Sequence, residues 1–219
     1  MQSTFYKLPK SDTVTRWRTR MGDGFTFTMK AYQALTHPYD SPTWTKRGSR
    51  FPPGNPERFG SLRPTEENFE IWEQVIHIGK ELGTEFVVVQ LPPSFINNSE
   101  NLGNLVAFFG SVERPFTVGI ELRHTSWFEE PAALGNILER LGLTDVLDPF
   151  RRNPVNVGNT AYFRLHGLAR NYRYTFTQGD LFLLKKKVES LQVDLCYVFF
   201  NNITMAQDAK RFEQLLNAG

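Results

Sequence analysis

Cysteine, long apolar runs and a strong excess of charge are all scarce in this chain. Its only cysteine, Cys196, excludes a disulfide framework, and the surrounding run LCYVFF predicts a buried structural thiol. No apolar run approaches the roughly 20 residues that a membrane helix needs, and the start MQSTFYKLPK lacks the pattern of a signal peptide. We therefore expect a cytoplasmic protein with no membrane partner.

Several functional motifs are missing as well. Neither G-x-G-x-x-G nor a phosphate loop occurs, which disfavours a doubly wound nucleotide-binding sheet. The four histidines are too few and too scattered for a multi-zinc cluster. A net charge of +2 gives no global argument for nucleic acid. With 219 residues, 40% of them hydrophobic, the chain is predicted to form one large globular domain over residues 1–219.

Short runs of apolar, β-branched and aromatic residues alternate with helical patterns along the chain. One helix is predicted to begin at Thr65, with Phe69, Trp72 and Ile76 on its apolar face. The runs that predict strands are Ser3 to Tyr6, Phe25 to Lys30, Phe86 to Leu91, Phe116 to Ile120, Val146 to Leu147, Ala161 to His166 and Leu195 to Phe200. This order predicts an α/β fold with a parallel sheet, and we favour a TIM-barrel-like (β/α) barrel, one strand short of eight. The Pro-, Gly- and Arg-rich segment 31–65 is predicted to be a lid-like loop.

Polar side chains follow these strands where substrates of β/α proteins bind, at the carboxyl ends. Glu121 is the candidate general base or acid, and His166 is the second proton carrier. Lys30, Arg123 and Arg164 suit an anion clamp, because a guanidinium group binds phosphate or carboxylate in a bidentate manner. The predicted substrate-binding residues are Lys30, Gln90, Arg123, Arg164, Tyr174, Asn201 and Asn202.

Each of these assignments has a structural alternative. Glu121 with Arg123 or Arg164 also suits an internal ion pair, and His166 also suits a buried histidine that is hydrogen-bonded to a neighbouring carbonyl group. His37, in the tripeptide Thr-His-Pro, remains open between a turn former and a ligand.

Six ordered motifs closely resemble the YecE-like family, domain of unknown function 72. They are STFYKLP, FTFTMKA with THP, VVQLPPSF, GIELRHTSW, YFRLHG with a downstream Tyr, and YVFFNN before an Ala-rich helix. The resemblance implies a TIM-barrel-like fold over essentially the whole chain. It also implies that the opening Gly-Thr-Ser-Gly-Trp strand and first helix of the family are missing here. The family has no settled activity, so the resemblance implies no substrate.

Three functions are compatible with these residues. The first is a hydrolytic enzyme for an anionic or sugar-phosphate substrate, with nucleic acid as a variant; it leaves open a single divalent metal ion on Glu121, Asp148 and His166. The second is a glycosidase that uses Glu121 and Asp148 as its carboxylate pair. The third is a non-catalytic module that binds nucleic acid or an anionic ligand through basic residues. These residues are Arg47, Arg50, Arg151, Arg152, Arg170 and Arg173.

Overall fold

Two compact units make up the chain, Met1–Gly142 and Leu143–Gly219. The computed structural model describes residues 1–46, 48–169 and 172–218. Each unit has three parallel strands with helices, and in each unit the strand order follows the chain. The predicted α/β class is confirmed.

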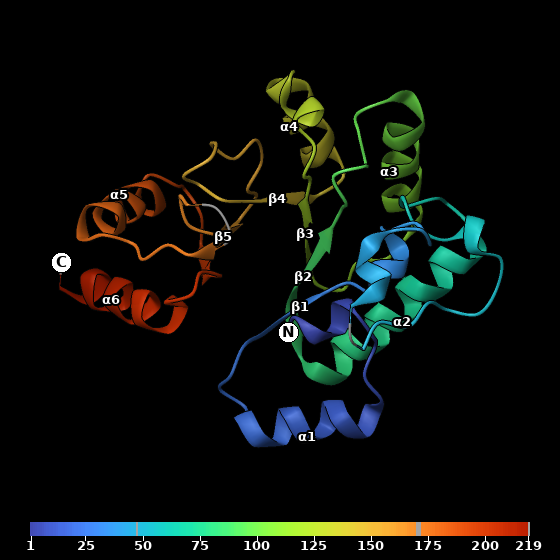
Figure 1. The fold of residues 1–219 in the computed structure, drawn as a ribbon, viewed down its shortest axis with the longest axis horizontal. Helices are drawn as coiled ribbons and strands as arrows, with labels where there is room; N and C mark the ends of the chain where they lie inside the picture. Colours follow the sequence, from blue (N-terminus) through green and yellow to red (C-terminus); the bar gives the residue numbers. More distant parts are fainter. Residues whose placement is uncertain (47, 170–171, 219) are drawn as a thin grey trace. The chain divides into compact units, whose positions relative to one another are not determined.

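The first unit contains strands β1 (Phe27–Lys30), β2 (Thr84–Gln90) and β3 (Thr117–Glu121). β2 pairs with β1 on one side and with β3 on the other, always in parallel (Figure 1). Near-continuous apolar runs allow strands to be buried on both faces, and β1 is buried over its whole length. The helices of this unit are α1 (Ser11–Met21), α2 (Glu66–Leu82), α3 (Ser99–Ser111) and α4 (Pro131–Arg140).

Helix α2 shows how local sequence sets an element. The Thr65 hydroxyl accepts a hydrogen bond from the Asn68 amide at its start, and Gly83 takes the left-handed conformation at its end. Its apolar face buries Trp72, whose indole N–H donates to the Glu113 carbonyl oxygen at 2.9 Å and whose ring packs edge-on against Phe108. The predicted helix is therefore confirmed together with its inward face.

The prediction of a strand from Ser3 to Tyr6 is wrong: Ser3–Phe5 is a 3-10 helix, η1. Only Met1 pairs with the outer edge of β1, through hydrogen bonds from its amino group to the Thr28 carbonyl and from the Lys30 amide to its own carbonyl. After Met1 the backbone hydrogen bonds become local, such as Tyr6 N–H to the Ser3 carbonyl at 3.1 Å. Phe5 is buried and Tyr6 is half-buried, but without a ladder these residues cannot form a strand.

The described part of the long segment that follows β1 contains three short 3-10 helices: η2 (Gln33–Leu35), η3 (Pro42–Thr45) and η4 (Pro56–Arg58). Its first part, residues 31–37, is buried, so this stretch belongs to the body of the unit. The lid role of the remainder stays a prediction. A further 3-10 helix, η5 (Thr125–Phe128), follows β3.

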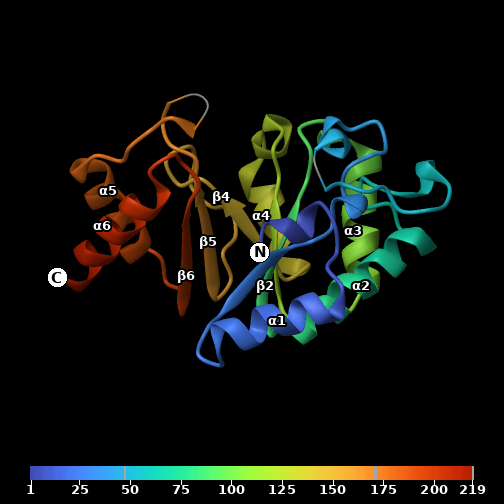
Figure 2. The same ribbon diagram turned by 60° about the horizontal axis from the view of Figure 1, so that its bottom comes forward.

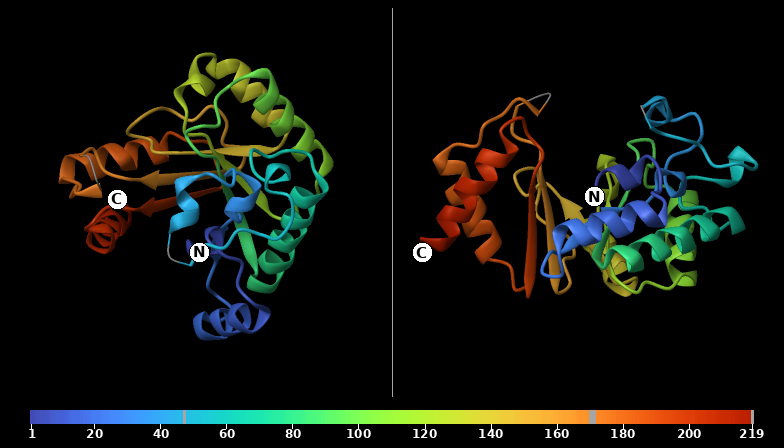
Figure 3. Two further views of the ribbon diagram at one scale, coloured as in Figure 1. Left: turned by 45° about the vertical axis from the view of Figure 1, so that its right-hand side comes forward. Right: turned by 90° about the horizontal axis from the view of Figure 1, so that it is seen from below.

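The second unit contains β4 (Leu143–Leu147), β5 (Thr160–Leu165), β6 (Leu195–Phe200), α5 (Gln178–Glu189) and α6 (Met205–Asn217). Helices α5 and α6 lie side by side, with β5 and β6 next to them (Figures 2 and 3). Between these elements lies an apolar core of Leu165, Phe176, Leu181, Leu184, Phe200 and Phe212. All three predicted strands of this unit are confirmed.

The described part of the chain thus contains six strands where seven were predicted. These strands establish parallel pairing, and closure of the sheet into a barrel stays a proposal. Among the described helices, none has both the length and the apolar character needed to cross a membrane.

Candidate functional site

The carboxyl ends of β1, β2 and β3 bring four predicted residues together: Lys30, Gln90, Glu121 and Arg123. We call these four residues the strand-end cluster. Gln90 and Glu121 are direct partners in the ladder of β2 and β3, so their side chains leave the same face. Lys30 is the last residue of β1, and its amide N–H donates to the Thr4 hydroxyl at 3.2 Å.

One amide oxygen joins the two cations of the strand-end cluster. Gln90 Oε1 accepts a hydrogen bond from Lys30 Nζ at 2.5 Å and another from Arg123 Nη2 at 2.9 Å. Both donors lack acceptor capacity, which identifies the atom facing them as the amide oxygen. Lys30 and Gln90 are each only 5% exposed, so these contacts are made in a largely water-free environment.

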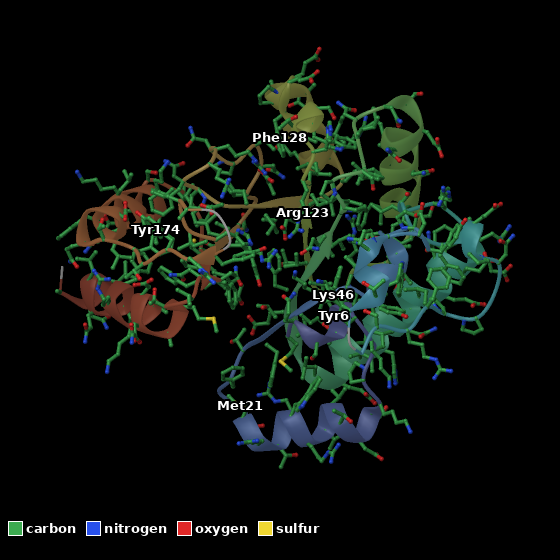
Figure 4. The ribbon with its side chains drawn as sticks, viewed as in Figure 1. Tyr6, Met21, Lys46, Arg123, Phe128 and Tyr174 are labelled. Carbon is green, nitrogen blue, oxygen red and sulfur yellow. The ribbon has the colours of Figure 1, made fainter. Side chains whose placement is uncertain are left out.

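Glu121 and Arg123 form an ion pair at the edge of the strand-end cluster. Glu121 Oε1 accepts from Arg123 Nε at 2.9 Å and from Arg123 Nη2 at 2.7 Å. The Glu121 side chain is 9% exposed but that of Arg123 is 34% exposed, so the guanidinium group reaches the surface (Figure 4). Its Nη1 atom makes no hydrogen bond with any residue that the structure describes. The contact predicted between Glu121 and Arg123 is confirmed, and their role in catalysis stays a prediction.

His37 is a neighbour of the strand-end cluster that was not assigned to the site from sequence. Burial, followed by the positive charges of Arg123 and Lys30, lowers the pKa of His37 to about 3 against a smaller opposite effect of Glu121. Its ring packs edge-on against Phe5 at a centroid distance of 5.1 Å, and Lys30 Nζ lies 5.3 Å from the centroid of the same Phe5 ring. The sequence signal was weak, since His37 stands in a loop seven residues after Lys30 with no strand pattern to orient it.

In the second unit, Asp148 and His166 lie close together. Asp148 Oδ2 accepts from the His166 backbone N–H at 3.1 Å and lies 3.9 Å from His166 Nδ1, while Oδ1 accepts from the Phe150 N–H at 3.1 Å. Asp148 therefore holds the backbone after β4 to the end of β5. Because Glu121 belongs to the first unit, the carboxylate pair of the glycosidase hypothesis and the joint proton transfer by Glu121 and His166 stay predictions.

Three other predicted residues make internal contacts in the second unit. The Tyr174 hydroxyl donates to Asp180 Oδ2 at 2.7 Å, and this bond raises the pKa of Tyr174. Asn202 Nδ2 donates to Asp208 Oδ2 at 2.6 Å and to the Tyr174 carbonyl at 2.6 Å. Asn201 is half-buried, and its amide N–H donates to the Leu165 carbonyl at 2.7 Å. Their substrate contacts stay predictions. Arg164 is buried in β5.

Two of the arginines predicted to bind nucleic acid lie close to carboxylate groups of the chain itself. Arg152 binds Asp145 through two hydrogen bonds of 2.5 and 2.6 Å, and Arg151 Nε lies 3.8 Å from Asp148. Arg47 and Arg170 lie outside the described residues. Cys196 was predicted to be buried but is only half-buried; desolvation raises the pKa of its thiol to about 11.

The side chains that could bind a metal ion are dispersed in the part of the chain that the structure describes. No group of three or more His, Cys, Asp or Glu side chains in the described ranges is placed to hold a metal ion. A divalent ion on Glu121, Asp148 and His166 stays a prediction. A separate hollow of about 420 Å³ is lined in part by Tyr6, Trp17 and Lys10.

Comparison with known proteins gives a family and two structural relatives. The family model described as "Protein of unknown function DUF72" matches residues 1–219. A DUF72 family protein of Thermotoga maritima is 25% identical, with a TM-score of 0.71, over 99% of this chain and 83% of that chain. One of Enterococcus faecalis is 20% identical, with a TM-score of 0.74, over 98% and 82%. No curated protein matches.

Proposed function

Because the chain belongs to the DUF72 family, the YecE-like proteins of unknown function, we propose its function from the residues of the strand-end cluster. The proposed function is acid/base hydrolysis of an anionic substrate of the phosphate or sugar-phosphate class. A TIM-barrel-like (β/α) barrel is the fold that we propose for the whole chain. The observation that carries the function is the convergence of Lys30 and Arg123 on one oxygen of Gln90, next to the Glu121 carboxylate.

Anion binding rests on the arrangement of the two cations. The Lys30 ammonium and the Arg123 guanidinium each have a nitrogen atom within 2.9 Å of Gln90 Oε1. A single phosphate or carboxylate group can therefore contact both. The guanidinium reaches the surface and has Nη1 uncommitted among the described residues, which gives an incoming anion a donor that it does not have to displace. Partial burial strengthens such contacts, because the local dielectric is low.

Glu121 supplies the base in this proposal. The two hydrogen bonds from Arg123 orient the carboxylate, and a carboxylate can take up a proton as a general base. A water molecule attacks the phosphorus and loses a proton to Glu121, a new P–O bond forms, and the bond to the leaving oxygen breaks. The protonated Glu121 then gives this proton to the leaving oxygen, so the carboxylate is regenerated. A part for His166 in this transfer is tested separately by His166→Gln.

The experiment measures hydrolysis of p-nitrophenyl phosphate, bis(p-nitrophenyl) phosphate and p-nitrophenyl glycosides, with Mg²⁺ and with a chelator. We expect turnover of a phosphate ester, and a loss of roughly 100-fold or more in kcat for Glu121→Gln, since general acid/base catalysis contributes about 10²- to 10⁴-fold. Glu67→Gln removes a surface ion pair with Arg58 and serves as the matched control with unchanged kcat.

The other outcomes separate the alternative functions. Phosphate binding without turnover of any ester identifies a non-catalytic anion-binding module, and a steep loss of oligonucleotide binding with salt assigns it to nucleic acid. Turnover of a glycoside that depends on both Glu121 and Asp148 identifies a glycosidase. Full phosphate-ester activity in Glu121→Gln removes Glu121 from the mechanism.

A further inference from the structure

His37 is buried and in contact with other residues through its ring, which a residue that only forms a turn does not require. The chain leaves β1 at Lys30, turns through η2 and brings His37 back under Phe5, the same ring over which Lys30 Nζ lies. The residue is only 2% exposed. The imidazole therefore sits inside the first unit, in the electric field of the strand-end cluster.

The segment 60–62 holds the backbone of this turn from outside. Its three amide N–H groups donate to the carbonyl groups of residues 34–36 at 2.7, 3.1 and 2.8 Å. Ser61 and Leu62 have φ values of 50° and 51°, a left-handed conformation that non-glycine residues adopt only when their surroundings enforce it. The backbone that leads to His37 is consequently held in place by hydrogen bonds from segment 60–62.

The hydrogen bonds around His37 favour one tautomer of its ring. The Gln33 carbonyl oxygen already accepts the Thr36 amide at 3.0 Å and the His37 amide at 2.8 Å. The Thr36 hydroxyl lies 3.4 Å from that same oxygen but 2.8 Å from His37 Nδ1, and we assign its proton to the shorter contact, with Nδ1 as the acceptor. A neutral imidazole that accepts at Nδ1 carries its own proton on Nε2 and donates there.

His37 Nε2 makes no hydrogen bond with a residue in the described parts of the chain. The atom is not fully enclosed, so a ligand or a water molecule can reach it, and a donor on so buried a side chain is expected to meet one. The charged groups that act on it are Arg123, Lys30 and Glu121; burial first, and then the two cations, lower the pKa of His37 and keep the imidazole neutral. A neutral donor beside two cations complements a ligand oxygen that carries negative charge.

We propose that His37 is the third donor of the anion site: its neutral imidazole donates a hydrogen bond from Nε2 to the oxyanion that Lys30 and Arg123 hold. This inference rests on the proposed function and adds a ligand contact to it. It makes His37 a binding residue and excludes it as the general base, because its Nδ1 is occupied and its Nε2 is already protonated.

Two substitutions at one position test the proposal. The side-chain amide of glutamine reaches the place of Nε2, whereas that of asparagine reaches only the place of Nδ1. We therefore expect His37→Asn to weaken the binding of inorganic phosphate by roughly tenfold or more, the usual effect of losing a hydrogen bond to a charged group. His37→Gln should stay within about threefold of the unaltered protein. His77→Asn, on the exposed face of α2, is the control. Calorimetry measures the affinities, and circular dichroism verifies folding.

Nitrogen-15 NMR of the histidine rings provides a readout that does not depend on folding of a variant. We expect His37 to be neutral and protonated on Nε2 at pH 7, with Nε2 shifting on addition of phosphate. An imidazolium, an Nδ1–H tautomer, or equal phosphate affinity of His37→Asn and the unaltered protein overturns the inference and leaves the proposed function standing. Absence of phosphate binding by the unaltered protein overturns the anion site itself, and His37 loses its proposed ligand with it.

Discussion

At the scale of single residues, Gln90 decides the electrostatics of the strand-end cluster. A neutral amide oxygen accepts from Lys30 and Arg123 without cancelling their charge, whereas a carboxylate in the same place would form two internal ion pairs. Glutamine adds no negative charge at this position, which is compatible with the proposed anion site.

Gln90→Glu tests this view with a nearly isosteric change. The added negative charge between the two cations should reduce phosphate affinity by roughly tenfold or more, because it both repels the anion and engages its donors. Calorimetric titration with phosphate measures the loss, and urea unfolding checks that the variant stays folded. Glu73→Gln on α2 is a suitable surface control. Unchanged affinity in Gln90→Glu would place the anion elsewhere.

The buried neutral His37 predicts a pH dependence of stability. Its pKa is about 3 in the folded chain and 6.5 for an unperturbed histidine, so between these values the unfolded chain binds the proton and the folded chain does not. We expect His37 to destabilise the fold progressively as pH falls below 6.5, by about 1.4 kcal/mol per pH unit at most. Urea unfolding at pH 7, 6, 5 and 4 should show a shallower loss for His37→Gln. Parallel curves for both proteins would contradict the low pKa.

At the scale of elements, the turn 34–37 and the segment 60–62 act as a pair. Gly60 has a φ of +79°, and a Cβ atom there would lie 2.9 Å from the His37 carbonyl carbon and oxygen. The close approach and the left-handed conformation both require glycine at this position. The pairing joins residues more than 20 positions apart, which no local sequence pattern indicates.

Gly60→Ala should therefore destabilise the protein by about 2–4 kcal/mol, from backbone strain and from the displaced turn. Gly103→Ala in α3 is the opposite case, since a Cβ there meets no atom within 4 Å, and it should stabilise the protein by about 0.5–1 kcal/mol. Urea unfolding measures both changes. Equal effects of the two substitutions would show that segment 60–62 is not a rigid brace.

At the scale of the whole molecule, the prediction of a single domain over residues 1–219 can be tested with natural probes. All four tryptophans, Trp17, Trp44, Trp72 and Trp127, belong to the first unit. In the second unit the buried Asp208 accepts from the Phe176 amide at 3.3 Å, from Asn202 at 2.6 Å and from Thr204 at 2.7 Å. A change in one unit can thus be read by fluorescence in the other.

Asp208→Ala removes this network and should destabilise the second unit by about 3–5 kcal/mol, because it leaves buried donors and the Arg211 charge without their acceptor. If the chain is one cooperative domain, the tryptophan fluorescence transition in urea moves with the circular dichroism transition. Glu213→Ala on the exposed face of α6 is the control. A fluorescence midpoint that does not move while ellipticity shifts would contradict a single domain.

The sequence by itself determined the elements and their polar ends, because hydrophobic periodicity and helix caps act over a few residues. It predicted six of the six strands described, the helix that begins at Thr65, and the proximity of Glu121 and Arg123. Only the tertiary structure decided that residues 3–5 form a 3-10 helix, since a strand depends on a ladder that its own sequence does not contain. It alone decided that Gln90 joins Lys30 to Arg123 and that His37 lies beside them, because both depend on contacts between residues distant in the chain.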